Sequence, residues 1–427
     1  ISNLICEKRE NQNALKKNIK IEDKKKYFQS FELSRDKFDL KNLRCQFVEF
    51  TDQFNKKTYL KKIEIKIKKD LILKKDNKKY LNYFENIENN LYLKSSKIVI
   101  DSDIYIPKNY VVKIKPGQSI ILKNNAFIIS DSRWLVGGKE KKTFITGLKD
   151  NFGGGLVIKN DSKASSFINT EFKFFSGVEN RFLHDFNFQK TDLVLTSSNE
   201  NKKNSYLYKK TNFQSKNFNF SDDFAFTGSI NFYNTKVDLK DCFFVKIDSE
   251  DALNIVSSKF DIDTVWFEEN SSDSIDIDFG KGEIKNGTFM YIGNDALDFS
   301  GSEVKVSKLF LSNVGDKLIS VGEKSNLVIY DILANNSYIG IASKDGSKSL
   351  VSKIDFNKVK IPFASYRKKG SYQHGFLKIE KPIKIKDYIS ITAKDKNSKI
   401  LINEDEINKF NKNIIQIVYK KKIDLLR

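Results

Sequence analysis

The sequence predicts an all-β protein whose main part is a parallel β-helix with about 22 residues per coil. A short apolar strand recurs at a nearly fixed spacing, an aspartate precedes several of its copies, and apolar residues alternate with polar ones between the copies. Self-similarity at such a period is the signature of a solenoid. Alternation with a period of two indicates strands, because helices would need apolar spacings of three and four.

The recurring strand defines the coils. From the second copy onward, successive copies start about 22 residues apart and deviate from this repeat interval by one residue at most. Further alternating segments, such as KFDID at 259–263 and TVWFEE at 264–269, follow each copy and indicate three strands per coil. The copies are GLVI at 155, SINF at 229, ALNI at 252, SIDI at 274, ALDF at 296, KLIS at 317, GIAS at 340 and PFAS at 362.

The solenoid is predicted to occupy residues 93–375, with smaller regions on both sides. Residues 1–92 are lysine-rich, and LKKIEIKIKK at 60–69 alternates as a strand does. This region is interpreted as the remnant of a preceding domain or as a cap, because an uncovered solenoid end exposes unpaired strand edges. Residues 376–427 are predicted to cap the other end. Residues 178–223 form a predicted insertion lobe, for which a binding role and no role both stay open.

Charge and composition narrow the range of partners. The formal net charge is +20, yet residues 248–298 hold 13 acidic side chains against three lysines, which argues against nucleic acid as the partner. The chain has two histidines, and its three cysteines (Cys6, Cys45 and Cys242) lie far apart, so buried free thiols are expected rather than a metal site or a disulfide framework. No apolar run approaches the roughly 18 residues of a membrane-spanning helix. The oligomeric state is not indicated.

Several segments carry a family resemblance. They include IYIPKNYVVKIKPGQSIIL at 104–122, FGGGLVI at 152–158 and TGSINFYNTKVDLKDCFF at 227–244. Over residues 95–380 the chain resembles the right-handed parallel β-helix proteins of the pectin lyase-like superfamily, which include pectate lyases and polygalacturonases. It is most similar to a bacterial subgroup, some of whose members follow a spore-coat-kinase-like domain.

The resemblance implies a right-handed solenoid outside the cytoplasm or at the cell surface. It also implies a protein that binds or processes an extended polysaccharide, acidic or neutral. If it is an enzyme, it is a polysaccharide hydrolase, lyase or epimerase. The alternative is a structural or adhesive solenoid without activity, forming the C-terminal part of a larger protein, because one fold hosts many functions.

An acidic ladder is predicted where the strand copies begin. Asp251, Asp273 and Asp295 follow one another at the full repeat interval, and Asp316 follows one residue short of it. Because stacked strands lie about 4.8 Å apart, Asp251, Asp273 and Asp295 are expected to form one column at the coil turns. Aspartate suits turns because its side chain accepts hydrogen bonds from backbone amides, which is a purely structural explanation.

A second column, facing outward from the same strand, is expected from Asn254, Asp276 and Asp298. Turn geometry does not explain why this column is acidic, so it is the predicted glycan-binding surface. Closely stacked carboxylates also repel one another, and a cation relieves that repulsion. Asp273, Asp276, Asp295 and Asp298 are therefore candidate ligands of a metal ion, with calcium as the suggested one.

A catalytic role is implied only by the resemblance. SSDSIDI and GNDALDF resemble the N-T-D and G-D-D motifs of polygalacturonases, which gives Asp273 and Asp295 as the carboxylate pair of an inverting hydrolase. Asn294 replaces one aspartate of the second motif, and Asp316 stands where that family has histidine. These three aspartates are the candidate catalytic residues.

A basic segment, YRKKGSYQHG at 366–375, places Arg367 and His374 at the end of the coils. A lyase or epimerase needs a base and a cation near a uronate carboxylate, so both residues are candidate binding residues. The competing interpretation is an exposed basic turn that closes the last coil. The segment lies about three coils beyond Asp295 and is expected to be separate from the ladder.

Overall fold

The computed structural model describes the chain in ten stretches, and these divide into two compact units. One unit comprises residues 1–75 and 180–225, and the other comprises 76–179 and 226–427. The described stretches are 3–10, 13–20, 31–32, 43–51, 58–62, 64–66, 78–159, 163–177, 192–196 and 227–419.

The first unit consists of antiparallel strands drawn from two distant parts of the sequence. β19, which belongs to the predicted insertion lobe, pairs with β3 and β6 of the N-terminal region. The two segments, predicted as separate parts, therefore share one unit. In the register of β1 and β4, Cys6 lies opposite Cys45. The strands are β1 (Asn3–Glu10), β2 (Asn13–Lys20), β3 (Phe31–Glu32), β4 (Leu43–Thr51), β5 (Thr58–Lys62), β6 (Glu64–Lys66) and β19 (Asp192–Thr196).

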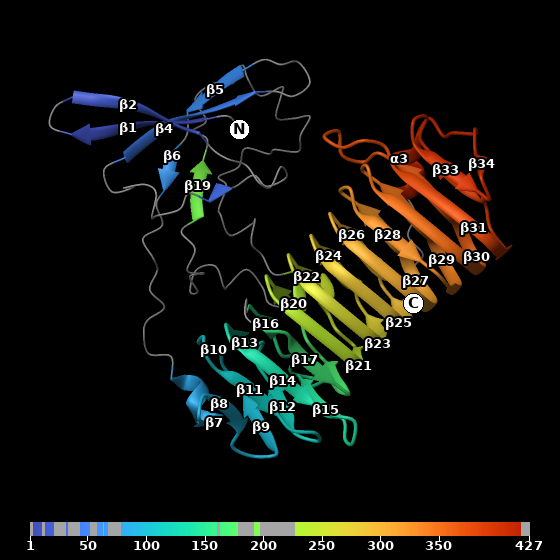
Figure 1. Cartoon of the computed structure of the whole chain (residues 1–427). Helices are drawn as coiled ribbons and strands as arrows, with labels where there is room; N and C mark the ends of the chain where they lie inside the picture. Colours follow the sequence, from blue (N-terminus) through green and yellow to red (C-terminus); the bar gives the residue numbers. More distant parts are fainter. Residues whose placement is uncertain are drawn as a thin grey trace. The chain divides into compact units, whose positions relative to one another are not determined.

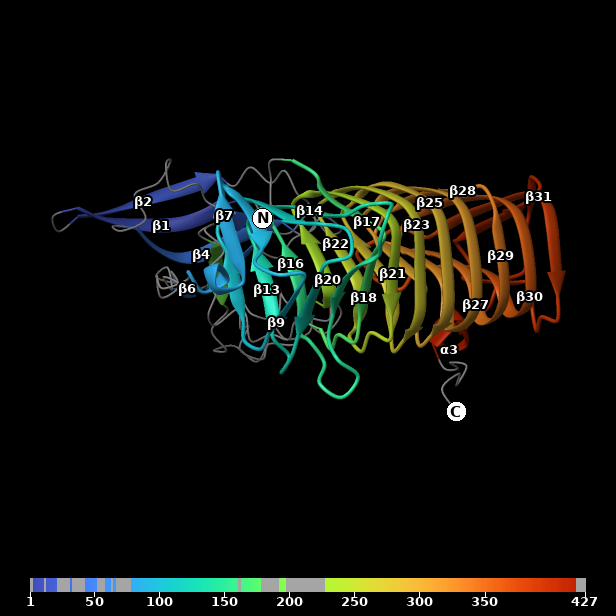
Figure 2. The same ribbon diagram turned by 90° about the horizontal axis from the view of Figure 1, so that it is seen from below.

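The second unit is a parallel β-solenoid of about 11 turns with about 23 residues per turn. The strands of successive coils lie side by side along the stack (Figures 1 and 2). Leu253 pairs with Ile275, and Ile275 pairs with Leu297, so the same side chains recur coil after coil. The predicted all-β solenoid is confirmed, and its right-handedness stays a prediction.

The solenoid strands vary from two residues to twenty. Its strands before the acidic repeats are β7 (Phe84–Ile87), β8 (Asn90–Leu93), β9 (Lys97–Ile100), β10 (Ile104–Ile106), β11 (Val111–Ile114), β12 (Ser119–Leu122), β13 (Phe127–Ser130), β14 (Arg133–Gly137), β15 (Thr143–Thr146), β16 (Gly155–Ile158), β17 (Ser165–Ile168), β18 (Thr170–Lys173), β20 (Gly228–Tyr233) and β21 (Lys236–Val245). The others are β22 (Asp251–Val256), β23 (Lys259–Asn270), β24 (Asp273–Asp278), β25 (Lys281–Ile292), β26 (Leu297–Ser300), β27 (Glu303–Gly322), β28 (Asn326–Ile329), β29 (Ile332–Lys344), β30 (Lys348–Tyr366), β31 (Phe376–Lys386), β32 (Thr392–Lys394), β33 (Lys399–Ile402) and β34 (Asp405–Glu406).

The core is a set of columns in which like side chains stack along the solenoid. The rings of Phe244, Phe267 and Phe289 are nearly parallel, with centroids 4.5 and 5.1 Å apart. Stacked aromatic pairs contribute about 0.5–1.5 kcal/mol beyond the area they bury. Cys242 is buried against this core as a free thiol, as expected. The outward side chains of each coil are thereby held in fixed register.

The two ends of the stack differ from the prediction. Parallel pairing begins with β8 and continues to β33, so the solenoid reaches beyond the predicted limits at residues 93 and 375. The sequence pattern did not predict the last coil for two reasons. Pro382 interrupts the alternation of apolar and polar residues in β31, and β32 has only three residues. Tyr80, in the 3-10 helix η2 (Lys79–Asn82), packs onto the core at the first coil.

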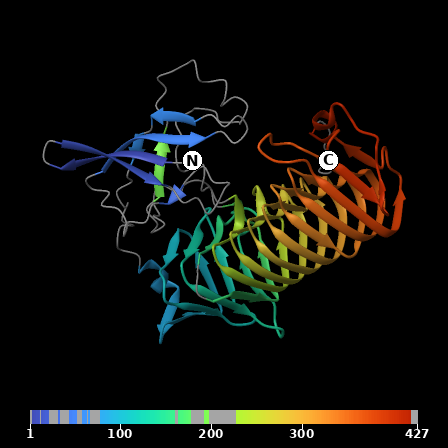
Figure 3. The ribbon, with the colours of Figure 1, turned by 45° about the horizontal axis from the view of Figure 1, so that its top comes forward.

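The C-terminal segment covers a side of the solenoid as well as its end (Figure 3). The hairpin of β33 and β34 closes the stack, and Ile407 packs against the core. Helix α3 (Ile414–Tyr419) instead lies on the outward face of the last coils, where Ile414 and Val418 pack against Ile339 and Ala364. The predicted end cap is therefore only part of what this segment does.

Candidate functional site

The acidic ladder lies on three consecutive coils, on strands β22, β24 and β26. Asp251 pairs with Asp273, and the outward residues Asn254, Asp276 and Asp298 follow one another in register. All the outward side chains of this column have their neighbours one coil apart, about 4.8 Å away. The structure thus brings the two predicted columns together on one face.

A lysine follows the three predicted aspartates in the turn column. Leu297 pairs with Ile319, so Lys317, two residues before Ile319, follows Asp295 in the column, and Asp316 does not. A slip of one residue would turn inward side chains outward, and burial of Ile319 prevents that slip. A lysine therefore ends the acidic column.

The turn aspartates bond the backbone of the following coil. Asp273 Oδ1 accepts a hydrogen bond from the backbone N–H of Asp295 at 2.8 Å, and Asp295 Oδ1 accepts one from Lys317 N–H at 3.0 Å. The Asn294 side chain also donates to Asp273 Oδ1, at 2.5 Å. The structural explanation of this column is thereby supported, although the bonds join coils and do not close a single turn.

Lys317 holds two carboxylates together beneath the surface. Its Nζ lies 3.3 Å from both oxygens of Asp295 and 2.5 Å from Asp316 Oδ2, and all three side chains are about 95% buried. Burial alone would lower the pKa of Lys317, but the charges of Asp295 and Asp316 raise it above its usual value. The ammonium group therefore stays charged and acts as an internal counter-ion.

Two further lysines reach back along the stack toward the outward acids. Lys344 Nζ lies 3.9 Å from Asp298 Oδ1 and donates to Ser320 Oγ at 2.8 Å. Lys369 forms an ion pair with Glu323. Asp298 Oδ1 is buried and accepts no hydrogen bond, since the lysine is too distant to donate one. The C-terminal side of the ladder is thus neutralised only in part.

Among the described residues, the N-terminal side of the ladder has no counter-ion of this kind. Within residues 227–419, no ion pair involves Asp251, Asp273 or Asp276. Burial, followed by repulsion from Asp295, raises the pKa of Asp273 to about 8. Burial likewise raises the pKa of Asp251 to about 7 and that of Asp276 well above its usual value. Burial also raises the pKa of Asp278, the last residue of β24 beside the ladder, to about 6. Part of this ladder is therefore protonated at neutral pH.

A cation could be held by three of the four predicted ligands. One oxygen from each of Asp273, Asp295 and Asp298 lies within 4.8 Å of the others. Asp276 lies apart from this group, and its Oδ2 accepts a hydrogen bond from Asn254 at 3.1 Å. Calcium takes six to eight oxygen ligands, so water would have to supply the remainder, and Lys317 already occupies part of the space around Asp295.

The calcium site stays a prediction with a direct measurement. Added calcium should raise the melting temperature of the protein, because an ion that binds only the folded state stabilises it. The rise should vanish when Asp298 is replaced by Asn, which removes one carboxylate of the cluster. The matched replacement of Asp261, an exposed carboxylate on β23, should leave the calcium response unchanged. An equal rise in both variants would show that calcium acts elsewhere.

The three candidate catalytic residues lie near one another but in unequal surroundings. Asp273 is partly exposed, whereas Asp295 and Asp316 are buried and bound to Lys317. Burial raises the pKa of Asp295 to about 6 even though Lys317 opposes that shift. An inverting hydrolase needs one carboxylate free to activate water, and neither partner of Lys317 is free. The catalytic assignment stays a prediction.

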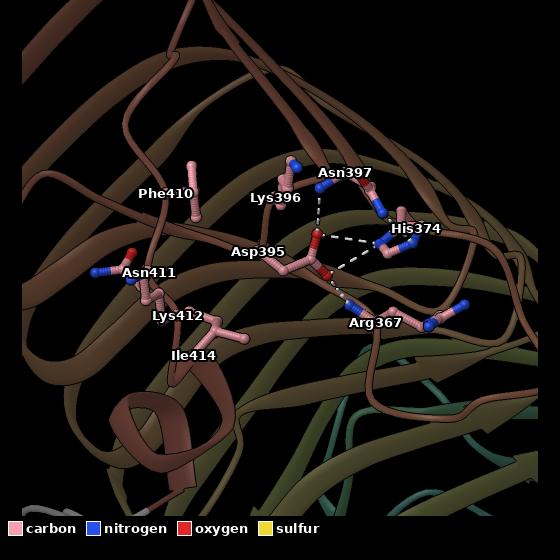
Figure 4. A pocket seen from close by; sticks show the side chains of 9 residues that line it. All are labelled: Arg367, His374, Asp395, Lys396, Asn397, Phe410, Asn411, Lys412 and Ile414. Atoms are coloured by element: carbon pink, nitrogen blue, oxygen red, sulfur yellow. Dashed lines mark hydrogen bonds and ion pairs between the residues drawn. The ribbon is translucent and has the colours of Figure 1, made fainter.

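Arg367 and His374 contribute to a separate pocket of about 400 Å³ at the end of the coil stack (Figure 4). The loop that carries them follows β30, and Asp395, which follows β32, binds it. Asp395 accepts hydrogen bonds from Arg367 N–H at 2.7 Å and from His374 Nδ1 at 3.0 Å. The sequence predicted the two basic residues and missed their carboxylate partner.

The residues that sequence reasoning missed are mostly partners of the ones it found. Lys317 could have been found, since it stands one full repeat interval after Asp295. Lys344 and Asp395 carried no such signal, because a long lysine side chain reaches across coils and Asp395 lies 28 residues beyond Arg367, in a coil that sequence spacing did not reveal.

Comparison with known proteins adds no family to this picture. No protein-family model matches the chain, and no curated protein matches its sequence. Among the helices in the described part of the chain, none has the length and apolar character needed to cross a membrane. The functional argument therefore rests on the geometry of the solenoid.

Proposed function

We propose that the chain is an extracytoplasmic or cell-surface protein that binds an extended polysaccharide along the outward face of β22, β24 and β26. The observation that carries this proposal is the outward column of Asn254, Asp276 and Asp298, which repeats once per coil and in which Asn254 is buried and the two carboxyl groups are partly exposed. Sugar hydroxyls donate to carboxylates, and a polymer with a regular repeat meets a regular row of acceptors. The location follows from the resemblance to secreted β-helix proteins.

The charge of this face favours a neutral polymer over an acidic one. No lysine is paired with Asp276 in the described part of the solenoid, and Asp298 has only the distant Lys344. An acidic polysaccharide would meet no unpaired cation along the column in the described part of the solenoid, which opposes binding. Binding is also favoured over processing, because Lys317 occupies both Asp295 and Asp316.

The test is an array of neutral and acidic polysaccharides, run beside an assay for released reducing sugar. Replacing Asp276 and Asp298 together with alanine should weaken binding of a neutral polymer by at least about tenfold, since the hydrogen bonds of two carboxyl groups to sugar hydroxyls are lost. The fold should survive, because the same column carries alanine at positions 342 and 364.

The matched control replaces Asp261 and Glu283 with alanine. These acids are also in register on adjacent coils but belong to β23 and β25, so the same loss of charge occurs on different strands. Binding should be unchanged in this control. Release of reducing sugar would show that the protein is an enzyme. Absence of binding to every polysaccharide on the array would favour the alternative of a structural or adhesive solenoid.

A further inference from the structure

The pocket at the end of the stack has a fixed framework. Besides Arg367 and His374, Asp395 accepts hydrogen bonds from the backbone N–H groups of Asn397 at 2.9 Å and Ser398 at 2.7 Å. Burial would raise the pKa of Asp395, but the bonds from Ser398, Arg367 and His374 lower it below its usual value. Asp395 is thus ionised, and both of its carboxylate oxygens already accept hydrogen bonds from protein groups.

The remaining charged side chains of the pocket are positive. Arg367, Lys396 and Lys412 come from three different segments and line the same space. All three are exposed, and in the solenoid residues with described side chains no ion pair involves them. Three cations around one space attract an anion, and arginine can bind a carboxylate, sulfate or phosphate through two parallel hydrogen bonds.

The other walls of the pocket suit a sugar ring. Phe410 lines it and is 43% exposed, so its ring is accessible from the pocket. Asn397 and Asn411 also line it and carry both donors and acceptors, which hydroxyl groups require. Asn397 Nδ2 lies 3.3 Å from His374 Nε2, so the imidazole is held at both of its nitrogens.

We propose that this pocket binds a sugar residue that carries an anionic oxygen group, with Arg367 and the two lysines contacting the anion and Phe410 contacting the ring. This site is distinct from the acidic face of β22, β24 and β26 and does not rest on the function proposed for it. The shared chemistry of the ligand is a carboxylate, sulfate or phosphate on a pyranose. Titration with sugars that carry each of these three groups distinguishes between them.

Calorimetric titration of the full chain with four probes tests the assignment: galacturonate, galactose 6-sulfate, galactose 6-phosphate and galactose. At least one anionic sugar should bind, and galactose should bind at least about tenfold more weakly. Arg367→Ala should weaken that binding by about tenfold or more. Lys384→Ala removes one exposed positive charge from β31, outside the pocket, and should change it less than about twofold.

Inorganic sulfate and phosphate separate a sugar site from a simple ion site. Phe410→Ala should weaken the anionic sugar and leave the inorganic ions unaffected. The proposal is overturned if no anionic sugar binds or if galactose binds equally well. It is also overturned if inorganic ions bind as tightly as the anionic sugar and Phe410→Ala weakens neither. It is also overturned if Lys384→Ala has the effect of Arg367→Ala. The Asp276 and Asp298 double variant should retain pocket binding, so failure of either proposal can be recognised separately.

Discussion

Replacing Lys317 with methionine should destabilise the folded protein by about 3–5 kcal/mol, since the change removes one partner of a buried ion pair. Methionine nearly preserves the length and apolar volume of the lysine side chain, so the main loss is the charge. Two carboxylates, Asp295 and Asp316, would then remain buried about 3 Å from an uncharged group. Thermal denaturation at neutral pH measures the loss.

Lys353→Met is the matched control for this variant. Lys353 Nζ lies 2.5 Å from Asp331 Oδ2, but its side chain is 60% exposed, so the loss should be at most about 1 kcal/mol. Adding Asp295→Asn and Asp316→Asn to Lys317→Met should restore much of the stability, because no buried charge then remains unpaired. Equal melting temperatures for the two lysine variants would contradict the role of Lys317 as counter-ion.

The solenoid could be predicted because its main determinant is local and periodic. Inward residues such as Leu253, Ile275 and Leu297 recur once per repeat interval, and each coil places them over the previous one. Burial enforces this register, so spacing in the sequence translates directly into position in the stack. The same logic predicted the outward column of Asn254, Asp276 and Asp298.

What could not be predicted depends on contacts without a period. Pairing of β19 with β3 and β6 joins segments that lie far apart in the sequence, and no local pattern signals it. The ion pairs of Lys344 and Lys369 depend on flexible side chains that cross two coils. The pocket around Asp395 depends on a last coil whose spacing departs from the regular repeat interval. Thus the sequence predicted the acidic ladder but did not predict the lysines that reach it from coils further along the stack.

The ladder also makes the stability of the protein depend on pH. The folded-state pKa of Asp273 is about 8, that of Asp251 about 7 and that of Asp278 about 6, all above the value of about 3.9 expected in the unfolded chain. In this interval the folded state holds protons that the unfolded state has lost. The contribution of these three groups to stability is therefore fully present below about pH 4 and is lost as the pH rises to about 8.

Asp273→Asn should remove the largest single part of this pH dependence. Asparagine keeps the Oδ1 acceptor that bonds Asp295 N–H and carries no charge, so the variant should match the wild type near pH 4. Near pH 8 it should be more stable by on the order of 3–5 kcal/mol, the free energy that corresponds to the raised pKa. Melting temperatures measured across this range, with Asp261→Asn as the exposed control, provide the test. A gain of equal size at both ends of the range would mean that Asp273 holds no proton at neutral pH, and a loss near pH 8 would mean that its charge stabilises the turn.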